Sequence, residues 1–223
     1  MSPLSIILRV SLIGVVLLSQ LIDPAHPAAE DQRPRIVALG DSLTAGLGVG
    51  PHESYPAQLQ QRLQALKYPH RVINAGVSGD TSAGGLRRIP WILQSKPVWV
   101  ILELGVNDGL RGLSLEQTRS NLEHMILRLH QAGVRVVLAG MKLPPNYGKE
   151  YTAGFEGIYP ALAKQYRLPF IPFFLEGVAA SAVLNQPDGI HPTPEGYRII
   201  VEAVLKTLRP LLDETPPKQD AKH

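Results

Sequence analysis

Residues 35–43 read RIVALGDSL, and this stretch decides the fold. Residues 35–39 form an apolar run of the kind found in strands buried on both faces of a parallel sheet. Gly40 lets the chain turn sharply where the strand ends, and Ser42 lies in that turn. In an open α/β sheet such turns face the crevice where ligands bind. The stretch therefore predicts that Ser42 lies at the ligand-binding edge of the sheet. The alternative is that the Gly-Asp-Ser turn is an ordinary loop with a helix cap.

The remaining sequence alternates between strand and helix patterns. Further strands are predicted at residues 71–75, 98–104, 134–138 and 169–171, and helices at 55–67, 82–93, 115–132, 153–166 and from Pro194 onward. Five strands joined by helical crossovers predict a three-layer α/β/α domain with a parallel sheet, covering residues 31–212. Residues 173–184 are ambiguous and compatible with a short helix. The polar segment 213–223 is predicted to be a disordered tail.

Helix boundaries are marked by capping residues. Ser54 precedes the helix predicted at 55–67, and Ser114 with Gln117 has the spacing of a capping box. Thr193 and Pro194 fit the N-cap and first position of the last helix. These signals support the element boundaries that the apolar spacing predicts.

Residues 1–30 have the pattern of a targeting segment rather than of the fold. Arg9 precedes an apolar run at 10–22, and small residues and prolines follow at 23–29. The run is shorter than the roughly 20 residues of a membrane span. Pro27 stands three positions before a cut after Ala29, where a small residue is preferred, so an uncleaved inner-membrane anchor is the alternative to a signal peptide. Either outcome places the domain outside the cytoplasm, in the periplasm, secreted, or near a membrane.

Composition excludes several classes of function. The 223 residues include no cysteine, which rules out disulfides, thiolate chemistry and a lipidated N-terminal cysteine. Lysines and arginines number 22 against 19 acidic residues and are scattered, so we expect no nucleic-acid partner. No His, Asp and Glu group has metal-ligand spacing, so we predict no metal and no cofactor. We expect a monomer acting on a small molecule.

Asp188 and His191 stand three residues apart in a loop that contains Gly189. This spacing lets the carboxylate reach one ring nitrogen while the other points toward Ser42. A serine, an imidazole and a carboxylate together make an activated hydroxyl nucleophile. The alternative is that His191 merely lies in the loop before the last helix.

Acyl transfer also requires hydrogen-bond donors for the oxyanion, and three candidates follow predicted strands. Ser42 and Gly79 can offer backbone N–H groups, and Asn107 can offer its side-chain amide. Gly79 could instead be a turn glycine and Asn107 a capping residue. Asp41 and Asp108 are interpreted as structural, holding the two turns by hydrogen bonds.

Four sequence blocks in this order resemble those of the GDSL or SGNH hydrolases. They are Gly40-Asp41-Ser42-Leu43, the NAGVSGDT segment with Gly79, the GVND segment with Asn107, and the DGIHP segment at 188–192. The NDGLRG segment at 107–112 and the LPPNYG segment at 143–148 are similar to the branch called acyl-CoA thioesterase I, lysophospholipase L1 or arylesterase. The likeness spans residues 35–211. Thr44 departs from the serine common in that branch.

The resemblance implies a flavodoxin-like sheet of strand order 2-1-3-4-5 and hydrolysis of carboxylic esters and thioesters with an apolar acyl or aryl group. It implies a triad of Ser42, Asp188 and His191, and an oxyanion hole of Ser42, Gly79 and Asn107. Neighbouring loops supply candidate walls of an acyl groove, or residues of ordinary loop packing: Leu110, Leu113, Pro145 and Tyr147. The rival hypotheses are an esterase for acetylated sugars and a non-catalytic envelope-binding module.

Overall fold

The computed structural model describes residues 31–214, so the predictions for residues 1–30 and for the end of the tail lie outside the described part. The elements follow in the order β1 (Arg35–Gly40), α1 (Ser42–Ala45), α2 (Tyr55–Ala65), β2 (Arg71–Gly76), α3 (Ser82–Gln94), β3 (Trp99–Glu103), α4 (Val106–Leu110), α5 (Leu115–Gln131), β4 (Arg135–Ala139), the 3-10 helix η1 (Pro145–Tyr147), α6 (Lys149–Tyr166), β5 (Phe170–Ile171) and α7 (Pro194–Asp213).

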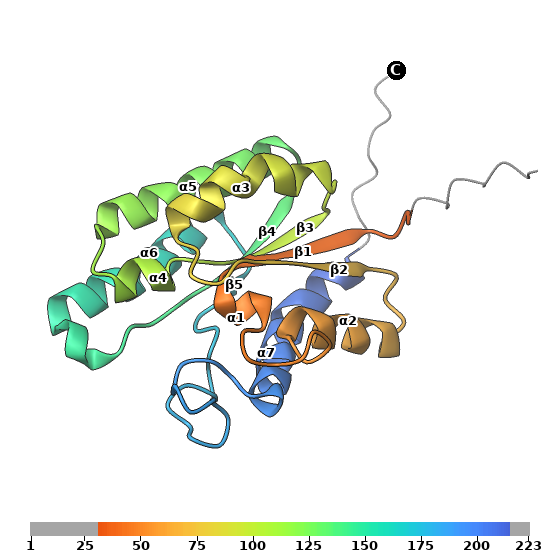
Figure 1. Ribbon diagram of the computed structural model, residues 1–223. Coiled ribbons are helices and arrows are strands. Elements are labelled where there is room, and N and C mark those ends of the chain that lie inside the picture. The colour runs from red at the N-terminus through yellow and green to blue at the C-terminus, as the bar shows by residue number, and fades with distance from the viewer. Residues whose placement is uncertain (1–30, 215–223) are drawn as a thin grey trace, which may run out of the picture. The chain divides into compact units, whose positions relative to one another are not determined.

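The five strands form one parallel sheet in the order β2-β1-β3-β4-β5, which confirms the predicted order (Figure 1). In the register between neighbours, Gly40 pairs with Gly76 on one side and with Glu103 on the other. Because all strands run in the same direction, their carboxyl ends meet at one edge of the sheet. The turns that follow β1, β2 and β3 therefore lie along a common edge.

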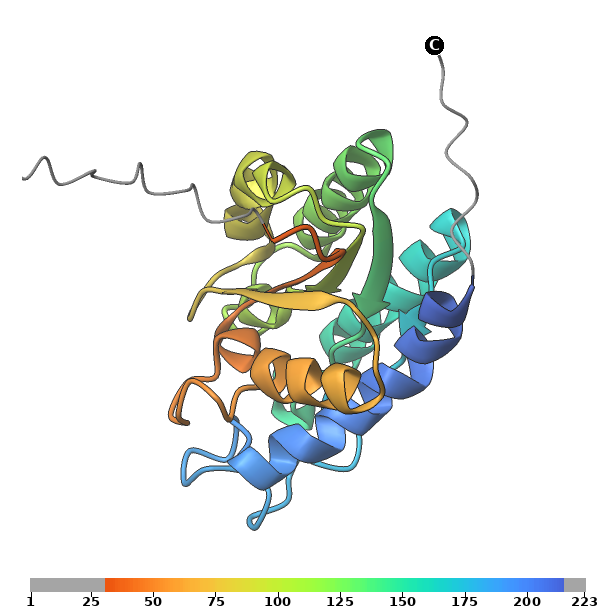
Figure 2. The same cartoon turned by 90° about the vertical axis from the view of Figure 1, so that its right-hand side faces the viewer.

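Helices cover both faces of the sheet, and this produces three layers. Figures 1 and 2 show α2 and α7 on one face and α3 and α5 on the other, with α6 packed against α5. All five residues of β3 are buried, as are five of the six in β1, whereas β2 at the edge is mostly half-exposed. The buried central strands explain why their sequences are nearly continuous apolar runs.

The long helices begin where their caps predict. The Ser114 hydroxyl accepts the backbone N–H of Gln117 at 3.2 Å, and the Thr193 hydroxyl accepts that of Gly196 at 3.3 Å. Ser54 is the N-cap of α2, but its side chain makes no capping hydrogen bond. The α7 helix then packs an apolar face against the sheet, with these buried side chains: Tyr197, Ile200, Val201, Val204, Leu205 and Leu208.

Five segments differ from, or decide between, the local expectations. Residues 42–45 and 106–110 were expected as turns and form the short helices α1 and α4, and α6 begins at Lys149 rather than near residue 153. Residues 173–184 contain no helix, because Gly177 and Ala180 adopt left-handed φ angles of +76° and +62° that interrupt helical hydrogen bonding. Asp213, predicted to begin the tail, is the last residue of α7.

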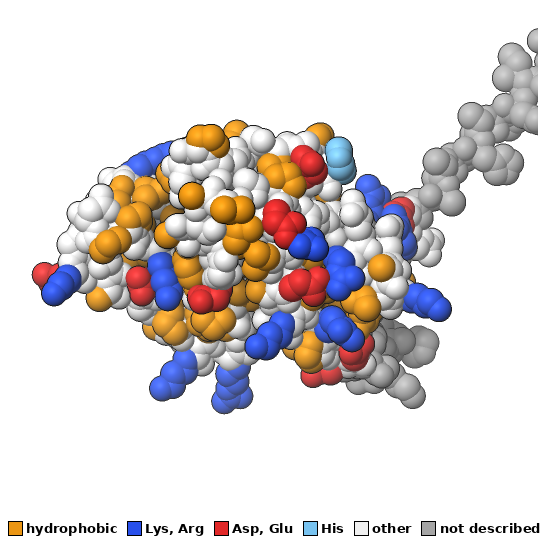
Figure 3. All heavy atoms as spheres, turned by 90° about the horizontal axis from the view of Figure 1, so that it is seen from below, with side chains coloured by type: hydrophobic (Ala, Val, Ile, Leu, Met, Phe, Trp, Pro, Cys, Tyr) orange, Lys and Arg blue, Asp and Glu red, His pale blue; other side chains and the backbone are white. Residues whose placement is uncertain are grey.

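The described surface carries mixed charge. On the face seen in Figure 3, Lys and Arg side chains are interspersed with Asp, Glu and hydrophobic groups rather than gathered in one basic patch. Within residues 31–214, no helix combines the length and apolar character needed to cross a membrane.

Close backbone packing at the sheet edge fixes where α1 begins. A Cβ on Gly76 would lie 2.1 Å from the backbone nitrogen of Ala45, and one on Gly40 would lie 2.0 Å from the Thr44 hydroxyl oxygen. Both distances are far below van der Waals contact, so only glycine fits at these strand ends. The first helical turn after β1 therefore packs directly onto the end of β2.

Candidate active site

Ser42 is the first residue of α1, immediately after the buried strand β1. The Asp41 carboxylate caps this helix by accepting the backbone N–H of Leu43 at 3.0 Å. Gly46 ends the helix in a left-handed conformation, with φ at +84°. The serine is thus held on a rigid short helix at the carboxyl edge of the sheet.

The structure brings Ser42, His191 and Asp188 into one hydrogen-bonded series across 149 residues of sequence. The distance from the Ser42 Oγ to the His191 Nε2 is 2.9 Å, and the distance from the His191 Nδ1 to the Asp188 Oδ2 is 2.7 Å. The second oxygen of Asp188 accepts the backbone N–H groups of Ile190 and His191, each at 2.9 Å. This arrangement orients the ring toward the serine hydroxyl.

The protonation state of Asp188 determines which ring nitrogen carries the proton. The backbone N–H of His191, followed by its ring and by the N–H of Ile190, lowers the pKa of Asp188 to about 2. The carboxylate is therefore ionised and can only accept, so the Nδ1 atom of His191 must donate. In the neutral ring this leaves Nε2 as an acceptor for the Ser42 hydroxyl, which is the tautomer that a general base requires.

The loop that carries His191 is tied to the loop that follows α1. Gln186 donates its backbone N–H to the His191 carbonyl at 2.7 Å, and its side-chain amide donates to the Leu47 carbonyl at 2.7 Å. Asn185 and Pro192 form an antiparallel bridge that closes the same loop. These contacts hold the histidine close to the serine without a regular strand or helix around it.

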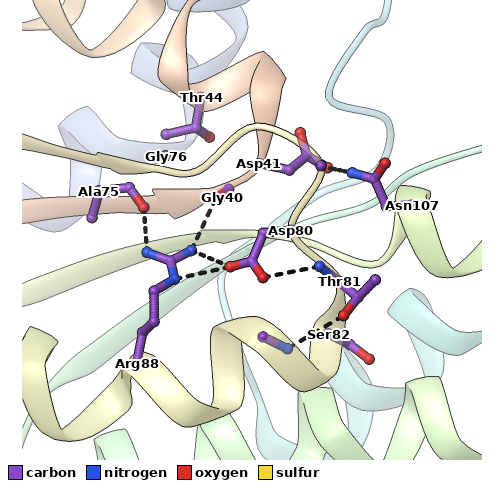
Figure 4. A network of polar contacts seen from close by, with 12 residues as sticks. Gly40, Asp41, Thr44, Ala75, Gly76, Asp80, Thr81, Ser82, Arg88 and Asn107 are labelled. Carbon is purple, nitrogen blue, oxygen red and sulfur yellow. Dashed lines mark hydrogen bonds and ion pairs between the residues drawn. The ribbon is translucent and has the colours of Figure 1, made fainter.

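Asn107 lies in α4, after β3, and its amide points toward the serine turn. Its Nδ2 donates to the Asp41 Oδ2 at 3.0 Å (Figure 4). The next residue, Asp108, is buried and accepts the Ser82 backbone N–H at 2.7 Å and the Ser82 hydroxyl at 2.6 Å. Both aspartates hold their turns by hydrogen bonds, as the sequence predicts.

Gly79 lies in the turn between β2 and α3 with a left-handed φ of +77°. Val77, in the same turn, donates its N–H to the Gly40 carbonyl at 3.1 Å, and Arg111 donates to the Gly79 carbonyl at 2.9 Å. A Cβ on Gly79 would have only the Arg111 guanidinium nearby, at 3.6 Å. The Gly79 turn is therefore linked to the end of β1 and to the segment after Asn107.

An apolar cavity of about 470 Å³ adjoins Ser42 and His191. Leu110 and Pro145 line it, as predicted, whereas Leu113 and Tyr147 do not. The Tyr147 hydroxyl instead donates to the Leu110 carbonyl at 3.1 Å, so this side chain supports the wall from outside. Leu113 is 43% exposed.

Sequence reasoning missed most of the cavity wall. The additional apolar side chains come from the loops after β4 and β5: Met141, Leu143, Phe173, Leu175, Ala179 and Ile190. The apolar residues of the long loop at 141–148 indicated part of this wall, because Pro145 was predicted from that loop. The 172–191 loop gave none, because its apolar residues follow neither helical nor strand spacing.

Two buried carboxyl groups lie beneath the serine turn. Glu103 is fully buried at the end of β3 and accepts the Thr44 hydroxyl at 2.8 Å, and Asp41 is also fully buried. Burial raises the pKa of Asp41 to about 6. Burial also raises the pKa of Glu103 well above its usual range, and the nearby charge of Asp41 adds to that shift. Glu103 was visible in the sequence as the one charged residue in the apolar run 98–104.

A parallel α/β domain that presents a serine, an imidazole and a carboxylate in series beside an apolar cavity defines a serine hydrolase. Residues 38–199 match the GDSL-like Lipase/Acylhydrolase family, and the chain belongs to that family. The sheet order and the ordered sequence blocks agree with this assignment.

Known relatives support the same class. The chain is 45% identical to Esterase TesA of Pseudomonas aeruginosa over 178 residues, covering 79% of this chain and 89% of that protein. It is 40% identical to Thioesterase 1/protease 1/lysophospholipase L1 of Escherichia coli K12 over 179 residues, covering 80% and 85%. A crystal structure of TesA superposes with a TM-score of 0.77 at 44% identity, covering 79% of this chain and 99% of that one. The chain is an enzyme that hydrolyses ester bonds.

We expect the two buried acids to make stability depend on pH. A carboxyl whose pKa is higher in the folded than in the unfolded protein stabilises the fold at low pH, and this stabilisation is lost as pH rises through the folded pKa. For Asp41 that window runs from about 4 to about 6, and Glu103 extends the loss to higher pH. The Glu103→Gln substitution removes one of these two buried titrating groups. Thermal melts should show a smaller fall in Tm from pH 5 to pH 8 than in the wild type.

Glu116→Gln is the matched control, because Glu116 is an exposed residue in the first turn of α5. Its melting curves should follow those of the wild type at every pH. Equal pH dependence of Tm in wild type and Glu103→Gln would show that Glu103 does not titrate as described.

Proposed function

We propose that the protein cleaves carboxylic esters and thioesters of apolar acyl or aryl groups through an acyl-enzyme on Ser42. One observation carries this proposal: the series from Ser42 through His191 to Asp188, with distances of 2.9 and 2.7 Å, opens onto the apolar cavity. The hydroxyl that attacks and the space that accepts an acyl chain are therefore adjacent.

The reaction proceeds in two halves. His191 takes the proton from the Ser42 hydroxyl as its oxygen attacks the carbonyl carbon, and Asp188 stabilises the imidazolium that forms. When the tetrahedral intermediate collapses, the carbon–oxygen or carbon–sulfur bond breaks and His191 gives the proton to the leaving alcohol or thiol. Water, deprotonated by the same ring, then attacks the acyl-enzyme and releases the acid.

The negative charge on the carbonyl oxygen requires fixed donors. We assign these to the backbone N–H groups of Ser42 and Gly79 and to the Asn107 amide. One N–H of that amide is held by Asp41, which fixes the orientation of the Asn107 side chain and leaves its second N–H for the oxyanion. The donors are preorganised because each belongs to a turn anchored at the sheet edge.

The cavity favours an acyl substrate over an acetylated sugar. An acetyl group would leave most of about 470 Å³ unfilled. The wall is mostly apolar, although Lys142 and Asn185 also line it, and its aromatic rings are those of Phe173 and His191. The relatives that are named as an esterase and as a thioesterase/lysophospholipase support the same choice. A non-catalytic module would not require the complete hydrogen-bonded series.

The location of the enzyme is a separate part of the proposal. The apolar run at residues 10–22, followed by small residues and prolines, supports export from the cytoplasm by a signal peptide or by an uncleaved anchor. An acyl substrate from a membrane lipid would be accessible in either case.

Two substitutions test the catalytic assignments. Ser42→Ala removes the nucleophile and should lower kcat by on the order of 10⁴-fold or more. Asn107→Ala removes one oxyanion donor and should lower kcat by about 10²–10³-fold with little change in KM. Hydrolysis of p-nitrophenyl butyrate measures both. Retention of kcat in Asn107→Ala would show that the amide does not face the oxyanion.

A bulky residue in the cavity wall tests the acyl assignment. Ala179 lines the cavity, so Ala179→Phe should shorten the space for the chain and lower kcat/KM for long p-nitrophenyl esters by about tenfold or more, while acetyl ester hydrolysis is retained. Ala161→Phe is the control, because Ala161 lies on the exposed side of α6. If long and short esters respond equally to Ala179→Phe, the cavity does not hold the acyl chain.

A further inference from the structure

Arg88 of α3 extends its guanidinium to the carboxyl edge of the sheet, where it makes contacts on three sides (Figure 4). Its Nη1 donates to the Ala75 carbonyl at 2.7 Å and its Nη2 to the Gly40 carbonyl at 3.1 Å. Its Nε and Nη2 lie 2.9 and 2.7 Å from the Asp80 Oδ2. One planar group therefore binds the ends of β1 and β2 and the turn that follows β2.

Two of these acceptors are close in sequence to the proposed oxyanion donors. Gly40 is separated from Ser42 by a single residue, and Asp80 directly follows Gly79. The guanidinium thus joins the two segments that supply the backbone donors of the oxyanion hole. The other Asp80 oxygen accepts the N–H of Thr81 at 3.1 Å, so the carboxylate is fixed at both ends.

We propose that Arg88 is a positioning residue that sets the spacing between the Ser42 and Gly79 N–H groups. This inference rests on the proposed function, since it concerns the oxyanion hole of the same site. Arg88 acts through Gly40 and Asp80 and contacts no residue of the triad.

The side chain suits this role for two reasons. Guanidinium donors have a fixed planar geometry, so three contacts made by one group also fix the positions of their acceptors relative to one another. The contacts are also largely shielded from solvent, since the side chains of Arg88 and Asp80 are 20% and 11% exposed. A lysine at position 88 would keep the charge but lose the planar fork.

The positioning role predicts a change in kcat rather than in substrate binding. Displacing a reacting group or donor by about 1 Å can cost about 10²-fold in rate, so Arg88→Met should lower kcat for p-nitrophenyl butyrate by about 10- to 100-fold. KM should change by less than about threefold, because the cavity that binds the acyl chain is untouched. Arg88→Lys should give a smaller loss of kcat.

A second measurement distinguishes positioning from general support of the fold. A boronic acid that forms a tetrahedral adduct on Ser42 requires the oxyanion donors, whereas the product carboxylate butyrate requires chiefly the cavity. Affinity for the boronic acid should fall in parallel with kcat in Arg88→Met, and affinity for butyrate should not. Both are measured at a temperature well below the Tm of each variant.

Arg62→Met is the matched control, since Arg62 pairs with Glu202 at 2.8 Å between α2 and α7, away from the strand ends. Its kcat should equal that of the wild type. A kcat of Arg88→Met within about threefold of wild type, or equal losses of boronate and butyrate affinity, would overturn the inference. If Arg88→Met does not fold, Arg88→Lys is judged by the boronate-to-butyrate ratio. A wild type without activity on the ester would instead refute the proposed function itself.

Discussion

The site depends on two hydrogen bonds that the buried carboxyl group of Asp41 accepts. One oxygen accepts the N–H of Leu43 and starts the helix that carries Ser42, and the other accepts the amide of Asn107 from the turn after β3. A single fully buried group thus orients both the proposed nucleophile, Ser42, and a proposed oxyanion donor, Asn107. Burial disfavours the ionised form of this carboxyl group, and desolvation raises the pKa of Asp41 to about 6. The hydrogen bonds from Leu43 and Asn107 partly offset that cost.

The site also depends on the parallel direction of the strands. It places the turns after β1, β2 and β3 along one edge, so residues far apart in sequence need only short local motifs to meet there. His191 reaches the same edge differently, from an irregular loop fixed by Gln186 and by the bridge between Asn185 and Pro192. The turns that carry Ser42, Gly79 and Asn107 are therefore held by the sheet, and the proposed base, His191, comes from a loop anchored to them.

The sequence was sufficient for those parts of the structure that follow from local patterns. Buried apolar runs predicted the strands, and the Asp188–His191 spacing predicted their mutual contact. The helix α1 escaped prediction because four residues are too few to show a helical apolar period. The irregular path of residues 173–184 escaped prediction because a left-handed angle is uncommon at a non-glycine residue such as Ala180. Arg88 looked like any helical arginine, since its three acceptors come together only in the folded sheet. Leu113 and Tyr147 were predicted to line the acyl groove only because their loops lie near the site. Proximity in sequence does not show whether a side chain lines the cavity or packs behind its wall.

The most direct test of the central claim is a crystal structure of the enzyme after reaction with a fluorophosphonate, a reagent whose bound form mimics the tetrahedral intermediate. The account predicts phosphorus bonded to the Ser42 Oγ, with one phosphonyl oxygen about 2.7–3.1 Å from the Ser42 N, the Gly79 N and the Asn107 Nδ2, and the reagent's alkyl chain in the cavity. Phosphorus on another residue, or a phosphonyl oxygen that faces solvent away from these three donors, would contradict it.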